Sequence, residues 1–287
     1  MRPNQKLQHG FTLVEMIVVI VITGIISGMV AMFIRTPVQG YMDSARRAEM
    51  TDIADTALRR MGRDIRTAVP NSVRVTGASP NFSIEFLPTK TGGRYRANAP
   101  GAGGCGGAGD DLAFAQATAD TCFEVIGPAT TAASNDYIVV GSTQSDAVPP
   151  YNTTSAGVLR LITAVGAVGA VQNITMTGAA SLPAFAQLDS QRFQVVDGTQ
   201  KAVTFACETV ATSAAGDGTG VLRRYWGYGF THAPGATSAI LADKISDCKM
   251  VYDIVNQRNA LVAITLQIKK DGETVNLYEE VHVNNVP

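Results

Sequence analysis

The chain lacks the features that mark several broad classes of protein. Lys and Arg number 23 and Asp and Glu 24 among its 287 residues, so it has no positive excess with which to neutralise nucleic-acid phosphates. We therefore expect no nucleic-acid partner. Charged residues make up only 16% and hydrophobic residues 46%, which excludes a disordered chain. The length allows one or two domains with a sizeable core.

The sequence also lacks a recognisable catalytic or metal-binding pattern. No HExxH, GxSxG or P-loop string occurs. The three histidines are isolated from one another, at His9, His232 and His282. Residues 101–106 match GxGxxG without the flanking strand and helix of a dinucleotide site, so they predict a surface loop. Asp110–Asp111 and residues 216–220 predict solvated turns, because neither follows a known Ca²⁺-loop pattern. We expect no enzymatic activity, no cofactor and no metal.

One long apolar run lies near the N-terminus. Phe11 to Ile34 carries a single formal charge, Glu15. A bilayer core needs about 20 apolar residues in a helix, so this run predicts a membrane-spanning helix. An ordinary signal peptide is cleaved after its apolar stretch at a small-x-small pattern, and the residues after Ile34 offer a poor site.

A processing signal stands in front of the run instead, in the string Gly10-Phe-Thr-Leu-Val-Glu15 after a basic leader. This string resembles the type IV prepilin family, which includes the pseudopilins of type II secretion. The resemblance implies that Gly10 ends the leader and that cleavage frees Phe11, which is then N-methylated. An intramembrane carboxylate costs roughly 2.5–3.5 kcal/mol and needs a partner. The resemblance supplies one for Glu15 in the free amine of Phe11 on a neighbouring subunit.

The resemblance also implies a location and a set of partners. The leader would lie in the cytoplasm and the bulk of the chain in the periplasm, as a single-pass inner-membrane protein that later joins a pilus at the cell surface. Its partners would be the prepilin peptidase and methyltransferase, other major and minor pilins through the N-terminal helix, the inner-membrane assembly platform, and membrane lipid before assembly.

The helical pattern continues beyond the membrane segment. Apolar or small side chains recur at i, i+3 and i+4 spacing, at Met50, Ile53, Ala54, Ala57, Leu58, Met61, Ile65 and Ala68. Pro70 favours an end to the helix just before it. Pro37 and Gly40 interrupt the middle, so we expect a kink or a locally unwound stretch there.

From Ser72 onward, short alternating segments separated by Gly, Pro, Asn and Asp predict β-strands. The expected strands are Ser72–Thr76, Phe82–Leu87, Asp111–Gln116, Thr121–Ile126, Tyr137–Val140, Val158–Ala164, Val171–Thr177, Arg192–Val196, Lys201–Thr209, Val221–Phe230, Lys244–Val255, Leu261–Lys269 and Val275–Val283. The last two form the clearest hairpin.

The predicted fold is therefore α+β: a long N-terminal helix packed on a mostly antiparallel β head. Its parts are a leader (1–10), a membrane and assembly segment (11–34), an amphipathic remainder of the helix (35–69) and the head (70–287). The head is large enough for two sheet layers, or for one sheet with long inserts.

All the cysteines lie in the predicted head, at Cys105, Cys122, Cys207 and Cys248. An even number of cysteines in an exported domain predicts disulfides. The sequence contains no CxxC pair of the kind that would indicate a metal site. Proximity along the chain favours Cys105–Cys122 and Cys207–Cys248, although three connectivities are possible. Each loop would contribute about 3–4 kcal/mol in the chain-entropy model.

A finer resemblance extends into the head. Residues 51–75, Gly92–Arg96 and Val281–Asn285 resemble the MshO type of minor pilin, from the mannose-sensitive haemagglutinin (MSHA) pilus system. This implies a structural subunit that helps to start or cap a type IV pilus. The alternatives are a minor pseudopilin of type II secretion, of the J type, and a pilus-tip adhesin that binds a surface ligand.

Overall fold

The protein consists of one long helix followed by β-strands. The computed structural model describes residues 11–97, 109–117, 119–143, 150–153, 157–168, 171–178, 181–230, 237–256 and 258–287. The chain divides into two compact units at Glu49 and Met50, and the helix α1 (Leu13–Arg66) contributes to both. All strands lie in the second unit, so the predicted α+β class is confirmed.

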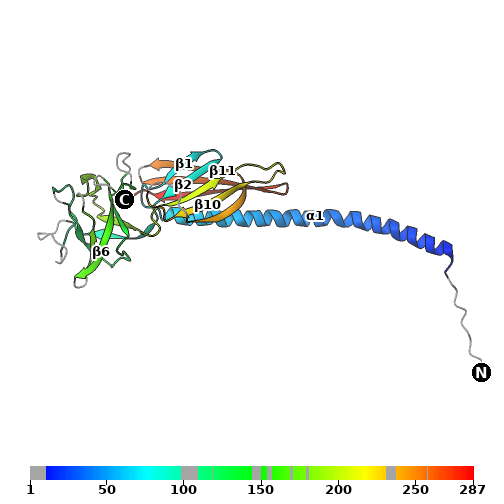
Figure 1. Cartoon of the computed structure of the whole chain (residues 1–287), viewed down its shortest axis with the longest axis horizontal. Helices are drawn as coiled ribbons and strands as arrows, with labels where there is room; N and C mark the ends of the chain where they lie inside the picture. The colour runs from blue at the N-terminus through cyan, green and yellow to red at the C-terminus, as the bar shows by residue number, and fades with distance from the viewer. Residues whose placement is uncertain are drawn as a thin grey trace, which may run out of the picture. The chain divides into compact units, whose positions relative to one another are not determined.

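In the first unit, α1 continues without interruption past Pro37 and Gly40 (Figure 1). Of the kink or locally unwound stretch expected at these residues, the unwound stretch is therefore wrong, and the kink stays a prediction. Proline removes only its own N–H from the ladder, and the bonds of the surrounding turns are sufficient to keep the segment helical.

The second unit contains a seven-stranded antiparallel sheet in the order β1-β2-β9-β10-β11-β12-β13. Its strands are β1 (Arg74–Ala78), β2 (Asn81–Phe86), β9 (Val203–Glu208), β10 (Gly220–Trp226), β11 (Ser238–Asn256), β12 (Asn259–Lys270) and β13 (Glu273–Asn284). The predicted last hairpin is confirmed as β12–β13, closed by Asp271 and Gly272. Both residues have positive φ, as a tight hairpin turn requires.

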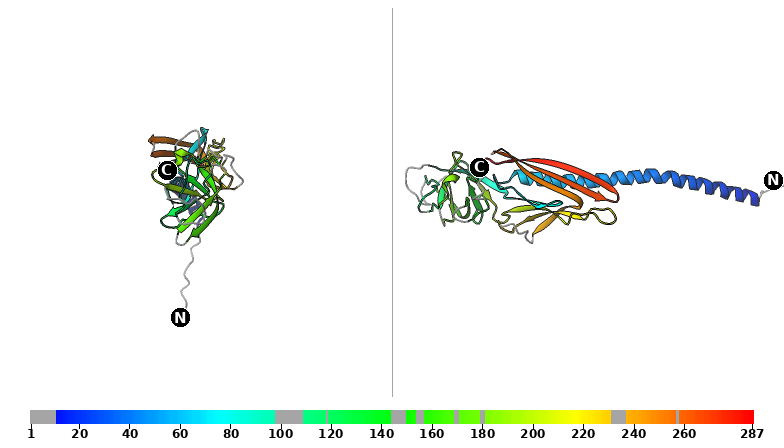
Figure 2. Two further views of the ribbon diagram at one scale, coloured as in Figure 1. Left: turned by 90° about the vertical axis from the view of Figure 1, so that its left-hand side faces the viewer. Right: turned by 90° about the horizontal axis from the view of Figure 1, so that it is seen from above.

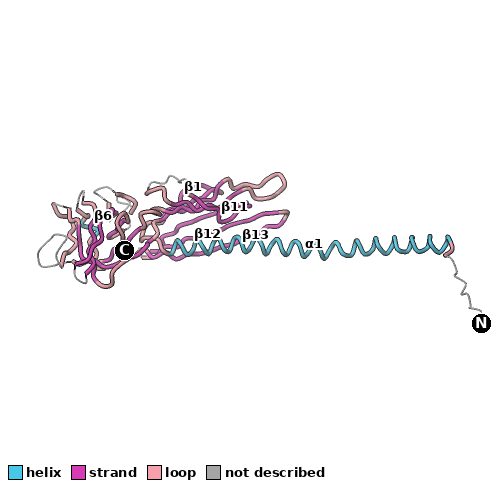
Figure 3. The backbone as a smooth tube through the Cα atoms, turned by 60° about the horizontal axis from the view of Figure 1, so that its bottom comes forward, coloured by secondary structure: helices cyan, strands magenta, loops and turns pink. Residues whose placement is uncertain are grey.

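The C-terminal part of α1 packs on this sheet (Figure 3). The buried helical residues follow the predicted stripe, at Met50, Ala54, Ala57, Leu58, Met61, Gly62 and Ile65. They meet the alternating apolar side chains of β12, such as Val262 and Ile264, in one core. Cys207 of β9 and Cys248 of β11 form a disulfide inside the same core. Cys105 lies outside the described residues, so its pairing with Cys122 stays a prediction.

A closed six-stranded barrel is inserted between β2 and β9 (Figure 2). Its order is β3-β4-β7-β6-β5-β8. The strands are β3 (Thr89–Tyr95), β4 (Cys122–Ile126), β5 (Tyr137–Val140), β6 (Leu159–Val168), β7 (Val171–Met176) and β8 (Arg192–Val196), with a short 3₁₀ turn η1 (Ala184–Ala186) before β8. The barrel has its own core, in which Tyr95, Phe123 and Phe193 make edge-on ring contacts. Of the two layouts expected for the head, one sheet with a long insert is the one found.

Two strand predictions fail in the barrel. The segment Asp111–Gln116 is not a strand: Phe114 makes only an isolated bridge to Leu182. The strand β3 lies in a segment for which the sequence predicts none.

Candidate assembly segment

The start of α1 is held by a reciprocal pair of contacts. The backbone N–H of Glu15 donates to Thr12 Oγ1 at 3.3 Å, and the backbone N–H of Thr12 lies 3.5 Å from Glu15 Oε2. This arrangement is a capping box, which satisfies N–H groups that have no partner inside the helix. Sequence reasoning assigned Glu15 only a partner on a neighbouring subunit. The Thr-x-x-Glu spacing was the signal for this second, local role.

The helix of the first unit exposes apolar side chains on every side. From residue 11 to 42 every residue is exposed, and the large apolar side chains range from 47% exposed at Met42 to 86% at Phe33. By length and composition α1 is able to cross a membrane, and none of its most apolar window is buried. Exposed apolar surface on this scale marks a membrane or protein interface. The segment therefore fits a membrane-anchored protein.

The polar side chain Thr23, in the middle of this apolar segment, is satisfied within the helix. Its hydroxyl donates to the carbonyl of Val19 and lies 3.2 Å from that of Ile20. Such back-bonding removes the cost of an unpaired hydroxyl in lipid. Glu15 is then the only formal charge that residues 11–34 bring into an apolar environment.

Comparison with known families points to the same segment. Residues 5–31 match the family described as the prokaryotic N-terminal methylation motif, and the match includes Gly10, Phe11 and Glu15. The chain carries the signature of a type IV prepilin-like protein. No curated protein and no solved structure matched the chain.

The backbone of Phe11 and Thr12 is not helical. Gly10 lies outside the described residues, and Phe11 and Thr12 precede the first residue of α1. The Phe11 side chain is 82% exposed.

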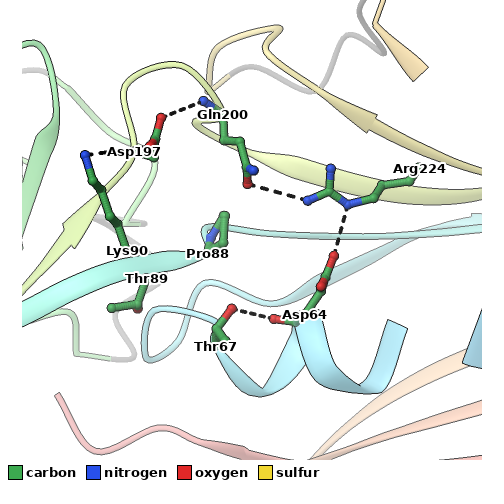
Figure 4. A pocket seen from close by; sticks show the side chains of 8 residues that line it. All are labelled: Asp64, Thr67, Pro88, Thr89, Lys90, Asp197, Gln200 and Arg224. Carbon is green, nitrogen blue, oxygen red and sulfur yellow. Dashed lines mark hydrogen bonds and ion pairs between the residues drawn. The ribbon is translucent and has the colours of Figure 1, made fainter. Parts of the chain in front are cut away.

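A second candidate site is a polar pocket of about 280 Å³ where α1, the sheet and the barrel meet (Figure 4). Its lining residues are Asp64, Thr67, Pro88, Thr89, Lys90, Asp197, Gln200 and Arg224. Arg224 Nε lies 3.0 Å from Asp64 Oδ2, which joins β10 to the helix. Lys90 Nζ lies 2.8 Å from Asp136 Oδ2 and 3.7 Å from Asp197 Oδ2, which joins β3 to the β4–β5 and β8–β9 connections.

The pKa shifts of two charged side chains in this pocket have structural causes. The hydrogen bond from Lys90 to Asp136 raises the pKa of the Lys90 ammonium. The Thr199 hydroxyl holds the pKa of Asp197 below its usual range, with further help from backbone N–H groups and Lys90. Each charge is thus stabilised by a protein partner. The Arg224–Asp64 pair lies within the sheet and helix part and the Lys90 pairs lie within the barrel and its connections, so each ion pair stabilises its own part. Arg224 Nη2 also lies 3.5 Å from Gln200 Oε1, in the β8–β9 connection.

The turns and histidines singled out in the sequence analysis are considered next. Asp217 Oδ1 accepts the backbone N–H of Asp271, so the Gly-rich turn is bonded to the β12–β13 turn. The backbone carbonyl of Asp110 accepts the N–H of Glu124. His282 is exposed on β13, whereas His9, His232 and residues 101–106 lie outside the described residues. Within the described part of the chain, no three His, Cys, Asp or Glu side chains are grouped as metal ligands.

Proposed function

We propose that this chain is a minor pilin, a non-enzymatic structural subunit that takes part in starting or assembling a type IV pilus. The observation that carries the proposal is the methylation motif at residues 5–31, which covers the start of a helix whose first part is apolar and exposed on every side. Such a helix spans the membrane before assembly and packs against other pilin helices afterwards. The resemblance of residues 51–75 to the MshO type supports an MSHA-type pilus.

The proposed sequence of events starts with the leader in the cytoplasm and the head in the periplasm. A prepilin peptidase cleaves between Gly10 and Phe11, and Phe11 is N-methylated. In the assembly platform, Glu15 pairs with the amine of Phe11 on a neighbouring pilin and sets the register of the two helices. Before cleavage, the same carboxylate caps its own helix.

The inserted barrel supports a minor position. It adds a second core and so enlarges the head. In the shaft of a filament, this larger head would have to fit between the heads of all neighbouring subunits. At a filament tip, fewer neighbouring heads surround the subunit. The same barrel favours a second candidate function, a tip adhesin whose barrel binds a surface ligand.

The test is an electron-microscopy count of surface pili on a strain that lacks this gene. We expect pili to be lost and to be restored by the wild-type gene. Glu15→Gln should not restore them, because glutamine still serves in a capping box but carries no charge. A Gly10→Val variant that is inserted but uncleaved is the processing control.

Other outcomes separate the alternatives. Normal pili with lost surface attachment would favour the adhesin. Normal pili with lost protein secretion would favour the pseudopilin and contradict the proposal.

A further inference from the structure

The polar pocket of Figure 4 is held in shape by backbone hydrogen bonds. The N–H of Thr89 donates to the carbonyl of Thr67 at 2.8 Å, so the start of β3 is bonded to the residue that follows α1. The N–H of Gly227 donates to the carbonyl of Gln200 at 2.9 Å, which bonds the β8–β9 connection to the residue that follows β10. The pocket is therefore largely preformed, as small-molecule sites usually are.

Polar side chains line this pocket in a connected row (Figure 4). Arg224 Nη2 lies 3.5 Å from Gln200 Oε1, and Arg224 Nε lies 3.0 Å from Asp64 Oδ2. At the other end of the row, Lys90 Nζ lies 3.7 Å from Asp197 Oδ2. The side chains of Asp64, Lys90 and Asp197 are partly exposed, whereas that of Arg224 is only 9% exposed. Solvent therefore reaches the pocket, and Arg224 is its most deeply buried charged group.

Several of these groups have hydrogen-bonding capacity left. A guanidinium group has five N–H donors, and Arg224 uses two of them on Asp64 and Gln200. Among the described residues, no hydrogen bond engages the side-chain nitrogen of Gln200, the hydroxyl of Thr89 or Asp64 Oδ1. A ligand in the pocket would thus find both donors and acceptors.

The charges of the lining argue against an ionic ligand. Asp64 and Asp197 carry two negative charges and Lys90 and Arg224 two positive ones, so the lining has no net charge. Each of these charges already faces one of the opposite sign. An anion, a cation or a zwitterion would have to separate these pairs, and a partly buried pair is costly to break. A hydroxyl group both donates and accepts, so it can bond to a paired donor and acceptor without separating them.

We propose that this pocket binds a neutral ligand rich in hydroxyl groups, of the size of a single sugar ring. Gln200 and Arg224 donate to its oxygens, and Asp64 and the Thr89 hydroxyl accept from its hydroxyl groups. The volume of about 280 Å³ lies just below the roughly 300–1,000 Å³ of pockets for drug-sized ligands, which limits the ligand to a small one. The inference goes beyond the proposed function and does not depend on it, because binding is a property of the single chain.

The chain has a built-in reporter for this site. Trp226 is its only tryptophan, and the guanidinium carbon of Arg224 lies 5.1 Å from the centre of the Trp226 ring. A ligand that bonds to Arg224 should therefore change the fluorescence of Trp226.

The test titrates the full chain with glucose, galactose, N-acetylglucosamine or xylose, and records the Trp226 fluorescence together with the heat of binding. The chain is held in phospholipid nanodiscs, because many detergents carry sugar headgroups. We expect saturable binding of at least one of these sugars, with a dissociation constant on the order of 1 mM, as a few hydrogen bonds to a small ligand would give.

Two variants test whether the pocket is the binding site. Gln200→Ala removes a donor and should weaken binding by about tenfold. Thr67 is exposed, so Thr67→Phe should leave the head folded, fill the pocket from its rim and abolish binding. Gln187→Ala changes an exposed glutamine outside the pocket and is the matched control, which should bind as the wild type does. Circular dichroism checks that each variant is folded.

L-serine and inorganic phosphate are the probes for the zwitterionic and anionic classes of ligand. Binding of either one in place of the sugars would overturn the class of ligand. Equal sugar binding by the wild type, Gln200→Ala and Thr67→Phe would place the sugar elsewhere and overturn the pocket. Absence of binding by every sugar would overturn the whole proposal. None of these results bears on the pilus count, so failure here is distinct from failure of the proposed function.

Discussion

The two parts of α1 are equally helical but meet opposite surroundings. From Leu13 to Glu49 no residue of the helix is buried, whereas seven residues between Met50 and Ile65 are buried against the sheet. Apolar content alone does not produce this difference, because the exposed part is the more apolar one. The arrangement of the apolar residues around the helix does.

In the second part, apolar residues occupy one stripe and arginines the opposite side, so one sheet is enough to cover the stripe. In the first part, apolar residues lie all round, and no single sheet could cover them. Such a helix needs an environment that surrounds it, either lipid or other helices. The C-terminal part of α1 therefore belongs to the core of a domain, whereas its N-terminal part is suited to contact lipid or other helices.

The largest effect should come from a charge placed in the buried stripe. Met61 is fully buried, so Met61→Arg loses its packing and buries an unpaired cation. We expect a loss of roughly 5 kcal/mol or more, comparable with the whole stability of a domain. The detergent-solubilised chain should lose its near-UV circular dichroism and its resistance to protease.

The matched control is Met29→Arg in the exposed part, where the side chain is 65% exposed. It should leave the head folded and reduce membrane insertion instead. If Met29→Arg unfolded the head as well, the contrast between the two parts of the helix would be wrong.

Removal of the buried disulfide should have the next largest effect. The Cys207–Cys248 bond closes a loop with a sequence separation of 41, which corresponds to about 4 kcal/mol in the chain-entropy model. Cys207→Ser with Cys248→Ser should lower the urea midpoint of the head without changing membrane association. An unchanged midpoint would show that packing by α1 alone fixes the sheet.

Local pattern was sufficient to predict both parts of α1 and the β12–β13 hairpin, because each depends on neighbours in the sequence. It did not predict the barrel, whose closure depends on β3 pairing with β8 across about a hundred residues. Strand periodicity identifies strands but not their partners.

The two wrong strand predictions have physical causes. β3 contains Gly92 and Gly93, which suggest a turn. In the barrel they allow close approach, since a Cβ on Gly93 would lie 2.8 Å from the Phe193 ring. Conversely, Leu112 and Phe114 alternate as in a strand, and both are buried in the barrel core without a ladder of their own. Alternating apolar residues indicate that one side of a segment is buried, and a segment can be buried in this way without pairing as a strand.

The smallest predicted effect is a pH-dependent loss of stability that concerns the head and not the exposed part of the helix. Arg96 Nε and Nη2 lie 2.9 and 2.7 Å from the two carboxylate oxygens of Glu124, and this pair holds the pKa of the Glu124 carboxyl below its usual range. A lowered pKa in the folded state means that the contribution to stability is present above about pH 4.5. It is lost as the pH falls through the lowered value.

Arg96→Gln should therefore reduce the stability of the head at pH 7, and the difference from wild type should shrink towards pH 3. The Glu124 side chain is only 4% exposed, but it keeps the backbone N–H of Gly109 as a partner at 2.6 Å, and solvent screens the 38% exposed Arg96 side chain, so we expect a smaller effect than from the two changes above. Urea unfolding at both pH values measures it, and membrane association of the exposed helix, which contains neither residue, is the internal control. An equal difference at pH 7 and pH 3 would mean that Arg96 acts through packing and not through its charge.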